Sequence, residues 1–148
     1  MAEHNDLGQL GEDLAISFLE EKKYKILQRN YRFQKAEIDI IAQLENTLIV
    51  VEVKTRTSIA FGLPQDFIKP AKIKLLVKAI NHYVETNHLD FEIRFDVIAI
   101  HKNKEGVFDI EHIEDAFYHF SSKNNFSFCI KSLVFCNLEK NKLNYGRF

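Results

Sequence analysis

Two runs of β-branched residues in the first half of the chain carry charged side chains in their interior. Glu37-Ile38-Asp39 opens the first run, and Glu52-Val53-Lys54 lies in the second. Both runs favour β-strands, because branched side chains fit the pleated surface of a sheet. Carboxylates and an ammonium are costly among aliphatic side chains unless another charge compensates them. The fold therefore has to bring these charges together or supply another partner for them.

The size and composition favour one globular domain. The 148 residues suffice for a substantial core, and 46% of them are hydrophobic and 28% charged. No apolar stretch approaches the ~20 residues that span a bilayer. Residues 1–10 are too polar for a secretory signal. We therefore expect a cytoplasmic protein with no membrane partner.

The cysteines and histidines do not suggest a zinc site. Cys129 and Cys136 have the spacing of neither a metal knuckle nor a disulfide framework, so we expect both to be reduced. The six histidines form no helical pair and no recognisable triad. This distribution argues against zinc binding and against nucleophilic catalysis.

The charge of the whole chain differs from the charge of its parts. A net charge of −1 excludes a strongly basic nucleic-acid-binding protein. Residues 22–35 nevertheless hold six basic and no acidic side chains, and residues 54–78 hold six basic and one acidic. Such stretches are most often plain solvated faces, but they also follow phosphate backbones on neutral proteins. The candidates for nucleic-acid contacts are Arg56, Lys72, Lys74 and Lys78.

The apolar spacing predicts an N-terminal helix from Leu7 to about Lys22. Glu12 falls inside the broad apolar arc of this helix, between Ile16 and Leu19 in projection. An acid that points toward the core either forms a salt bridge with a neighbouring Lys or Arg or joins a site with the charged strands. The helix pattern alone leaves both interpretations open.

The charged strands form a predicted β-hairpin, Glu37–Ala42 and Leu48–Thr55. A two-residue turn at Glu45-Asn46, with Asn46 in a positive-φ conformation, sets the register. This register places Asp39 opposite Glu52 and Glu37 opposite Lys54, with all four side chains on one face. A slip of one residue would turn the set to the other face.

The remaining pattern predicts further elements around this hairpin. We expect a short edge strand at Tyr24–Leu27, a loop at Ile59–Lys69, a helix from Pro70 to Val84, strands at Phe91–Ile100 and Val107–Ile113, and a short helix at Glu114–Phe120. This order favours an α/β domain over residues 1–120, with a central mixed β-sheet flanked by helices. Residues 121–148 form a C-terminal extension, either disordered or contributing an added strand around Phe126–Phe135.

The opposed carboxylates predict a metal site. Two acids facing each other on a sheet repel, and a bound Mg²⁺ or Mn²⁺ removes that cost because hard cations prefer oxygen ligands. Asp39 and Glu52 would be side-chain ligands, and Glu12 would complete the sphere directly or through water. Lys54 would orient the attacking water and stabilise charge on a phosphate. The alternative is a pair of structural cross-strand ion pairs, with Lys54 bonded to Glu37 or Glu52.

Several motifs together resemble those of a known nuclease superfamily. They are Gly8-Gln9-Leu10-Gly11-Glu12-Asp13-Leu14-Ala15, Glu37-Ile38-Asp39-Ile40-Ile41-Ala42, Val50-Val51-Glu52-Val53-Lys54-Thr55-Arg56, Phe61-Gly62-Leu63-Pro64, the helix containing Lys72, and Arg94-Phe95-Asp96-Val97-Ile98. The arrangement resembles the PD-(D/E)xK superfamily, which has a restriction-endonuclease-like fold and includes Holliday-junction resolvases. More closely, the chain resembles the YraN-like family of uncharacterised bacterial proteins (UPF0102), over about residues 7–120.

The resemblance implies a three-layer restriction-endonuclease-like domain with Asp39, Glu52 and Lys54 at the catalytic positions and Glu12 as a further acid. It implies an endonuclease that hydrolyses DNA phosphodiesters with Mg²⁺ or Mn²⁺, including those of branched or recombination intermediates. Enzymes that act on junctions usually work as symmetric pairs, so a homodimer is expected, although no dimer seam is visible in the sequence. The alternative is a non-catalytic nucleic-acid-binding or adaptor protein of the same fold.

Three positions qualify the resemblance. Ile38 replaces the proline that gives the superfamily its name, which is a common variation. Lys35-Ala36 stands where the closer family usually has small glycines before Glu37, which affects the loop that enters the site. Asp96 matches the family pattern, and it serves either as a ligand or as a partner of Arg94 at the edge of the core.

Overall fold

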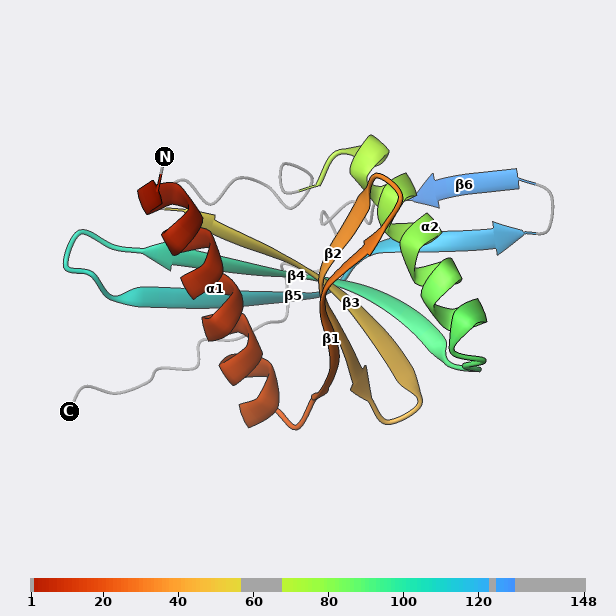
Figure 1. Ribbon diagram of the computed structural model, residues 1–148, viewed down its shortest axis with the longest axis horizontal. Helices are drawn as coiled ribbons and strands as arrows, with labels where there is room; N and C mark the ends of the chain where they lie inside the picture. The colour runs from red at the N-terminus through yellow and green to blue at the C-terminus, as the bar shows by residue number, and fades with distance from the viewer. Residues whose placement is uncertain (1, 57–67, 123–124, 130–148) are drawn as a thin grey trace, which may run out of the picture.

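The computed structural model describes residues 2–56, 68–122 and 125–129 of the chain (Figure 1). Its elements are α1 (Ala2–Glu21), β1 (Lys25–Phe33), β2 (Ala36–Leu44), β3 (Thr47–Arg56), α2 (Pro70–Thr86), β4 (Glu92–Lys102), β5 (Phe108–Ser122) and β6 (Asn125–Cys129). The strands lie side by side in chain order. Only β3 and β4 pair in parallel, so the sheet is mixed.

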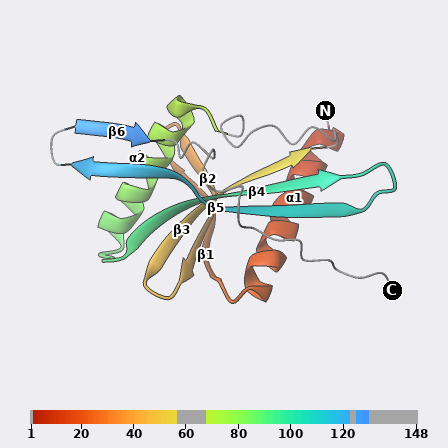
Figure 2. The ribbon, with the colours of Figure 1, turned by 180° about the vertical axis from the view of Figure 1, so that it is seen from behind.

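The two helices pack on opposite faces of the strongly twisted sheet, each in its own core cluster. Figures 1 and 2 show them to either side of the point where the strands cross in projection. Ala15 and Leu19 of α1 pack in one core cluster with Ile40, Val51 and Ile98. The apolar stripe of α2 packs in the other cluster, against alternate residues of the same strands, including Ile41, Val50 and Val97. Strands buried on both faces read as continuous aliphatic runs, which explains the composition of β2, β3 and β4. The predicted α/β fold with a central mixed sheet and flanking helices is confirmed, and it is consistent with a restriction-endonuclease-like domain.

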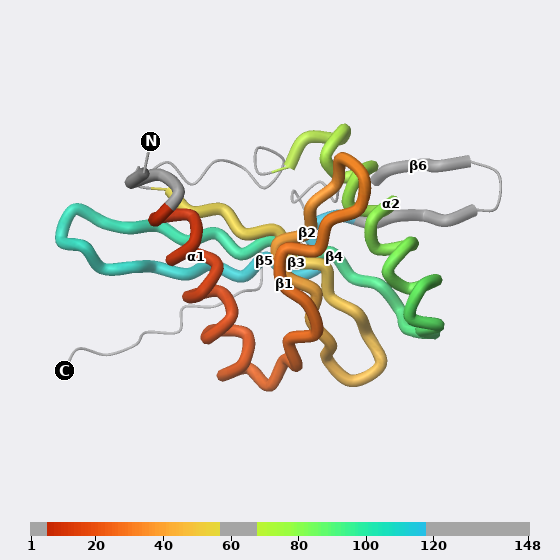
Figure 3. The backbone as a smooth tube through the Cα atoms, in the orientation of Figure 1, coloured from red at the N-terminus to blue at the C-terminus, as the bar shows by residue number. Residues whose placement is uncertain are grey.

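The hairpin register agrees with the prediction over its buried part. The pairs run from Leu44–Thr47 to Ile40–Val51, as the predicted turn at Glu45-Asn46 requires. The positive φ falls on Glu45, at 52°, and not on Asn46. The ladder does not extend to the predicted pairs Asp39–Glu52 and Glu37–Lys54, because the strands part beyond Ile40. Figure 3 shows the two strands as neighbouring parts of the trace.

The predicted short helix at Glu114–Phe120 is wrong. These residues belong to β5, which continues to Ser122. The register between β4 and β5 shifts after Phe95–Phe117, and Asp115 in the shifted part has a φ of 52°. The Asp115 N–H donates to Asp96 Oδ1 at 3.0 Å, so a side chain from the neighbouring strand holds this bulge. A pattern within β5 alone does not show such a partner.

The bounds of α2 and β1 differ from the predicted ones. Helix α2 begins at Pro70, where the missing N–H costs nothing, and continues to Thr86. Strand β1 is longer than the predicted Tyr24–Leu27. Residues 57–67, which hold most of the predicted loop and the Phe61–Pro64 motif, lie outside the described residues.

The predicted boundary between residues 1–120 and 121–148 remains a prediction. Strand β5 crosses it, and β6 pairs with the last residues of β5. Residues 130–148 lie outside the described part. No helix in the described ranges is long and apolar enough to cross a membrane.

Candidate functional site

The four predicted site residues line one cleft. The cleft has a volume of about 290 Å³ and lies where β2 and β3 part, beside α1. Its described lining consists of Leu7, Gly8, Glu12, Asp39, Glu52, Val53, Lys54 and Thr55. The predicted site residues, which come from a helix and two strands and lie up to 42 positions apart in the sequence (Glu12 to Lys54), therefore reach one space.

Asp39 is anchored at the point where the strands separate. Its Oδ2 accepts a hydrogen bond of 2.7 Å from the Val53 backbone N–H. A side-chain oxygen therefore takes the place of a backbone partner just past the last ladder pair, Ile40–Val51. Glu37 points to β1 instead, where it bonds Arg32 at 3.1 Å, so the predicted Glu37–Lys54 pair does not form.

Glu52 is a buried carboxylate held between two ammonium groups. Its side chain is 3% exposed, Lys54 Nζ lies 2.5 Å from Oε1, and Lys72 Nζ lies 3.2 Å from Oε2. Lys54 shares strand β3 with Glu52, two positions further along. Lys72 comes from the first turns of α2, across the opening. The ion pair between Lys54 and Glu52 is one of the two pairings that the sequence left open.

The electrostatics of the cleft favour protonation of Asp39. Burial, followed by the nearby charge of Glu52, raises the pKa of Asp39 from 3.8 to about 6. The Val53 N–H and the two lysines act in the opposite direction and do not restore the ordinary pKa. An ionised Asp39 is therefore costly in the metal-free protein, and a cation that binds it would recover that cost.

Glu12 reaches the cleft because α1 lies very close to β3. A Cβ atom built on Gly11 would lie 1.9 Å from Thr55 Oγ1, so only glycine permits this approach. The C-terminal end of β3, yellow in Figure 3, runs beside the N-terminal half of α1. Glu12 Oε2 is buried and has no hydrogen-bond partner among the described residues. Of the two interpretations of this inward acid, the structure shows the cleft position, and Glu12 forms no ion pair with any described residue.

The donor set suits a hard divalent cation. Glu12, Asp39 and Glu52 supply only carboxylate oxygens, which Mg²⁺ and Mn²⁺ prefer. Buried oxygens of Glu12 and Glu52 lack hydrogen bonds, which is the condition that a cation would relieve. Within the described part of the chain, no three His, Cys, Asp or Glu side chains are gathered closely enough to hold a metal ion. Binding would therefore require the carboxylates to close around the ion.

The candidates for nucleic-acid contacts occupy three different places. Lys72 pairs with Glu52, although Lys72 is not itself among the residues that line the cleft. Lys74 and Lys78 lie on the outer side of α2, where they line a groove of about 580 Å³ together with Phe33 and His82. Lys78 Nζ donates to Gln34 Oε1 at 2.6 Å. Arg56 ends β3 and is exposed. Their role in binding nucleic acid remains a prediction.

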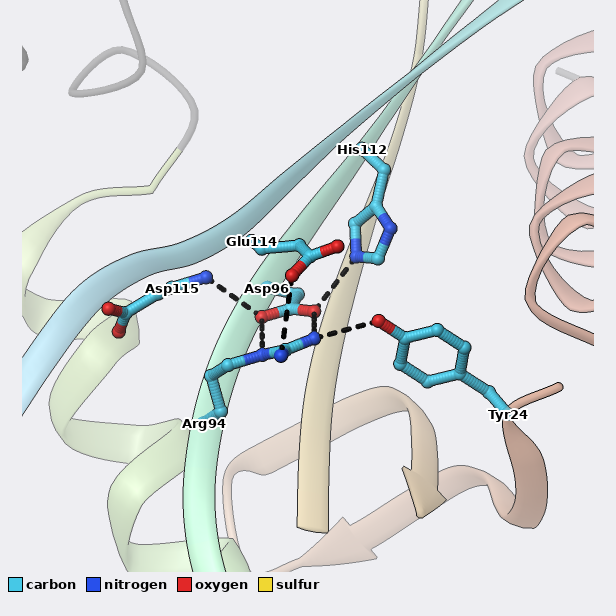
Figure 4. A network of polar contacts seen from close by, with 6 residues as sticks. All are labelled: Tyr24, Arg94, Asp96, His112, Glu114 and Asp115. Carbon is cyan, nitrogen blue, oxygen red and sulfur yellow. Dashed lines mark hydrogen bonds and ion pairs between the residues drawn. The ribbon is translucent and has the colours of Figure 1, made fainter. Parts of the chain in front are cut away.

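A second buried acid, Asp96, lies on β4 close to Tyr24, which follows the C-terminal end of α1 (Figure 4). Arg94 binds both carboxylate oxygens, with Nε at 2.9 Å and Nη2 at 2.8 Å. His112 Nε2 lies 2.8 Å from Oδ2, and the Asp115 N–H donates to Oδ1. Arg94 also donates to the Tyr24 hydroxyl at 2.9 Å. Asp96 is thus a partner of Arg94, the structural one of the two roles that the sequence left open.

The pKa of Asp96 is shifted in the opposite direction to that of Asp39. Burial alone would raise the pKa of Asp96, but the hydrogen bonds from His112, Arg94 and the Asp115 N–H hold it below the ordinary value. The sequence did not identify His112 or Tyr24 as members of this cluster. The available signal was the alternation of Arg94 and Asp96, which puts both side chains on one face of β4.

Comparisons with known proteins give the family. The model of the uncharacterised protein family UPF0102 matches residues 11–100. A UPF0102 protein of Flavobacterium psychrophilum is 68% identical over 120 residues, which cover 81% of this chain and all of that protein. A UPF0102 protein of Flavobacterium johnsoniae is 61% identical, with the same coverage of both chains. One of Bacteroides fragilis is 48% identical over 80% of this chain and 97% of its own. The chain therefore belongs to the uncharacterised protein family UPF0102.

Proposed function

We propose that this protein is a metal-dependent endonuclease that hydrolyses DNA phosphodiesters, with branched or recombination intermediates among its substrates. The observation that carries the proposal is the convergence of Glu12, Asp39, Glu52 and Lys54 in one cleft. Three carboxylates next to a lysine are a donor set suited to phosphodiester hydrolysis with Mg²⁺ or Mn²⁺.

Each residue has a distinct task in this proposal. Asp39 and Glu52 would hold the cation, and Glu12 would bind it directly or through a water molecule. When bound, the ion would lower the pKa of a water molecule and neutralise charge on the phosphate. Lys54, 33% exposed at its side chain, would orient the attacking water and face the phosphate. Hydrolysis forms a P–O bond to the water oxygen and breaks the ester P–O bond, whose oxygen takes up a proton.

A cleavage assay tests the proposal. Single-stranded, duplex and four-way DNA are incubated with the full chain and either Mg²⁺ or Mn²⁺. We expect metal-dependent cleavage that Lys54→Ala reduces by at least about 100-fold, the scale of losing a positioned charged group at a reacting phosphate. Lys102→Ala is the matched control, because Lys102 lies over the Phe108 ring and is not among the residues that line the cleft. Cleavage that persists in Lys54→Ala would contradict the assignment.

One observation favours a second function, a non-catalytic nucleic-acid-binding or adaptor protein of the same fold. Both oxygens of Glu52 already lie beside lysines, so this acid has charge partners without a metal. In that case the acidic cleft would serve stability. DNA binding by the wild type without cleavage, at any metal concentration, would support this second function.

A further inference from the structure

We propose that Lys72 is a built-in counter-cation of Glu52, which an incoming divalent cation displaces toward the substrate phosphate. The inference rests on the proposed function and assigns to α2 a positioning role in the same site. It separates Lys72 from Lys74 and Lys78, which lie on the outer side of the helix.

The two lysines hold Glu52 differently. Lys54 Nζ donates a hydrogen bond to Oε1 at 2.5 Å. Lys72 Nζ lies 3.2 Å from Oε2, yet Oε2 is buried without a hydrogen bond of acceptable geometry. The contact with Lys72 is therefore an ion pair alone, and Oε2 is the oxygen that a cation can take over at the smaller cost.

The partners also differ in their freedom to move. Glu52 belongs to β3 and pairs with Val97 of β4, and its side chain is 3% exposed. The Lys72 side chain is 34% exposed and comes from the first turns of a helix. A long, partly exposed side chain can swing away while the carboxylate stays in place. Lys72 is thus the member of the pair that yields.

The summed charge of the acids and lysines also supports the displacement of Lys72. The carboxylates of Glu12, Asp39 and Glu52 and the ammonium groups of Lys54 and Lys72 sum to −1 when all are ionised. A divalent cation changes this sum to +1, so repulsion favours the movement of one ammonium away from Glu52. A phosphodiester carries one negative charge and restores neutrality when the freed Lys72 faces it. Metal binding and phosphate binding would therefore support each other.

The test measures Mn²⁺ affinity by isothermal titration calorimetry in the wild type and in Lys72→Gln. Removing the competing ammonium is expected to tighten Mn²⁺ binding at least about threefold. Mn²⁺ is also expected to raise Tm more in Lys72→Gln than in the wild type, because the metal-free variant leaves Glu52 Oε2 without its ion pair. Lys69→Gln is the matched control, since it removes the same charge from the same end of α2 at an exposed position.

The outcomes are distinct. A Kd that falls in Lys72→Gln and stays within about twofold of the wild type in Lys69→Gln supports the inference. Lys72→Arg, which keeps the positive charge, is expected not to tighten binding. Equal Mn²⁺ affinities in the wild type and Lys72→Gln would overturn the inference and leave the proposed nuclease standing. Absence of Mn²⁺ binding in every variant would overturn both.

Discussion

Two clusters are built around buried acids, and they treat their charges in opposite ways. Asp96 receives hydrogen bonds from Arg94 and the Asp115 N–H and contacts His112, and its pKa is lowered. Asp39 has one backbone donor and a neighbouring acid, and its pKa is raised to about 6. A buried acid with all its partners stabilises a fold, whereas an acid short of partners is prepared for a ligand.

The surroundings of the two clusters explain the difference. Asp96 lies between Arg94 and the bulge of β5, whose backbone supplies a donor that a regular strand would not direct at it. The cleft at Asp39 lies where the β2–β3 ladder ends; among the described residues, Asp39 accepts one backbone hydrogen bond and none from a side chain, whereas Asp96 also has Arg94 and His112 as side-chain partners. Neutralising one carboxylate in each cluster should therefore have opposite consequences for stability.

The largest effect is expected at Asp96. In Asp96→Asn the free energy of unfolding should fall by about 3–5 kcal/mol, because Arg94 and His112 keep their buried positions without a counter-charge. Urea unfolding at pH 7 measures this loss. Asp109→Asn, at an exposed position of the same strand pair, is the control and should change stability by less than about 0.5 kcal/mol. Equal values for the two variants would remove the distinction between the clusters.

Mn²⁺ should stabilise the protein through the Asp39 cluster and not through the Asp96 cluster. Mn²⁺ at about 100 times its Kd should stabilise the wild type by about 2.7 kcal/mol. Asp39→Asn and Glu52→Gln should lose this gain, whereas Asp96→Asn should keep it on a lower baseline. Thermal unfolding with Mn²⁺ or with EDTA measures the effect. A gain in all four proteins would place the metal elsewhere.

The approach of α1 to the cleft depends on Gly11. Gly11→Ala should cost about 1–3 kcal/mol, because the added methyl group meets Thr55 Oγ1 and pushes the helix from β3. Gly8→Ala is the matched control, since a Cβ there meets no atom within 4 Å. Chemical denaturation distinguishes the two variants. Adding Thr55→Ala to Gly11→Ala should restore part of the lost stability. If Gly11→Ala leaves the free energy of unfolding unchanged, α1 does not lie as close to β3 as the structure shows.

The smallest expected effect is a difference in the pH dependence of stability between Asp39→Asn and the wild type. The folded-state pKa of Asp39, about 6, exceeds the ordinary 3.8, so its contribution to stability is present below pH 3.8 and is lost as the pH rises through about 6. Asp39→Asn lacks this loss. Between pH 4.5 and 8, in EDTA, it should therefore gain about 1–2 kcal/mol relative to the wild type.

Asp96 should show the reverse trend over acidic pH. Its lowered pKa contributes stability above the ordinary pKa of an aspartate, and this contribution is lost as the pH falls through the lower folded-state value. Asp96→Asn should therefore become less different from the wild type in acid. Parallel pH profiles for the two asparagine variants would contradict the opposite assignments.

The sequence predicted the parts of this molecule that depend on local pattern. Two aliphatic runs and the short turn between them predicted the hairpin register from Leu44–Thr47 to Ile40–Val51. Pro70 marked the start of α2. The motifs that contain residues 12, 39, 52 and 54 were enough to predict that these four side chains lie in one place.

The features that escaped prediction depend on partners distant in the sequence. The β2–β3 ladder ends next to Asp39, whose side chain accepts the Val53 N–H. The bulge at Asp115 is held by Asp96 in the neighbouring strand, a partner that the local pattern does not reveal. The pattern of these residues therefore led to the wrong prediction of a helix. The contact between Lys72 and Glu52 requires α2 to dock on the sheet, which a helix pattern does not reveal.

The most direct measurement of the central claim is the anomalous scattering of crystals soaked in Mn²⁺. We expect one strong peak in the cleft, coordinated by Asp39 and Glu52, with Lys72 moved away from Glu52 Oε2. A cleft without manganese, in which both lysines still bind Glu52, would contradict the claim that these acids are arranged for a cation.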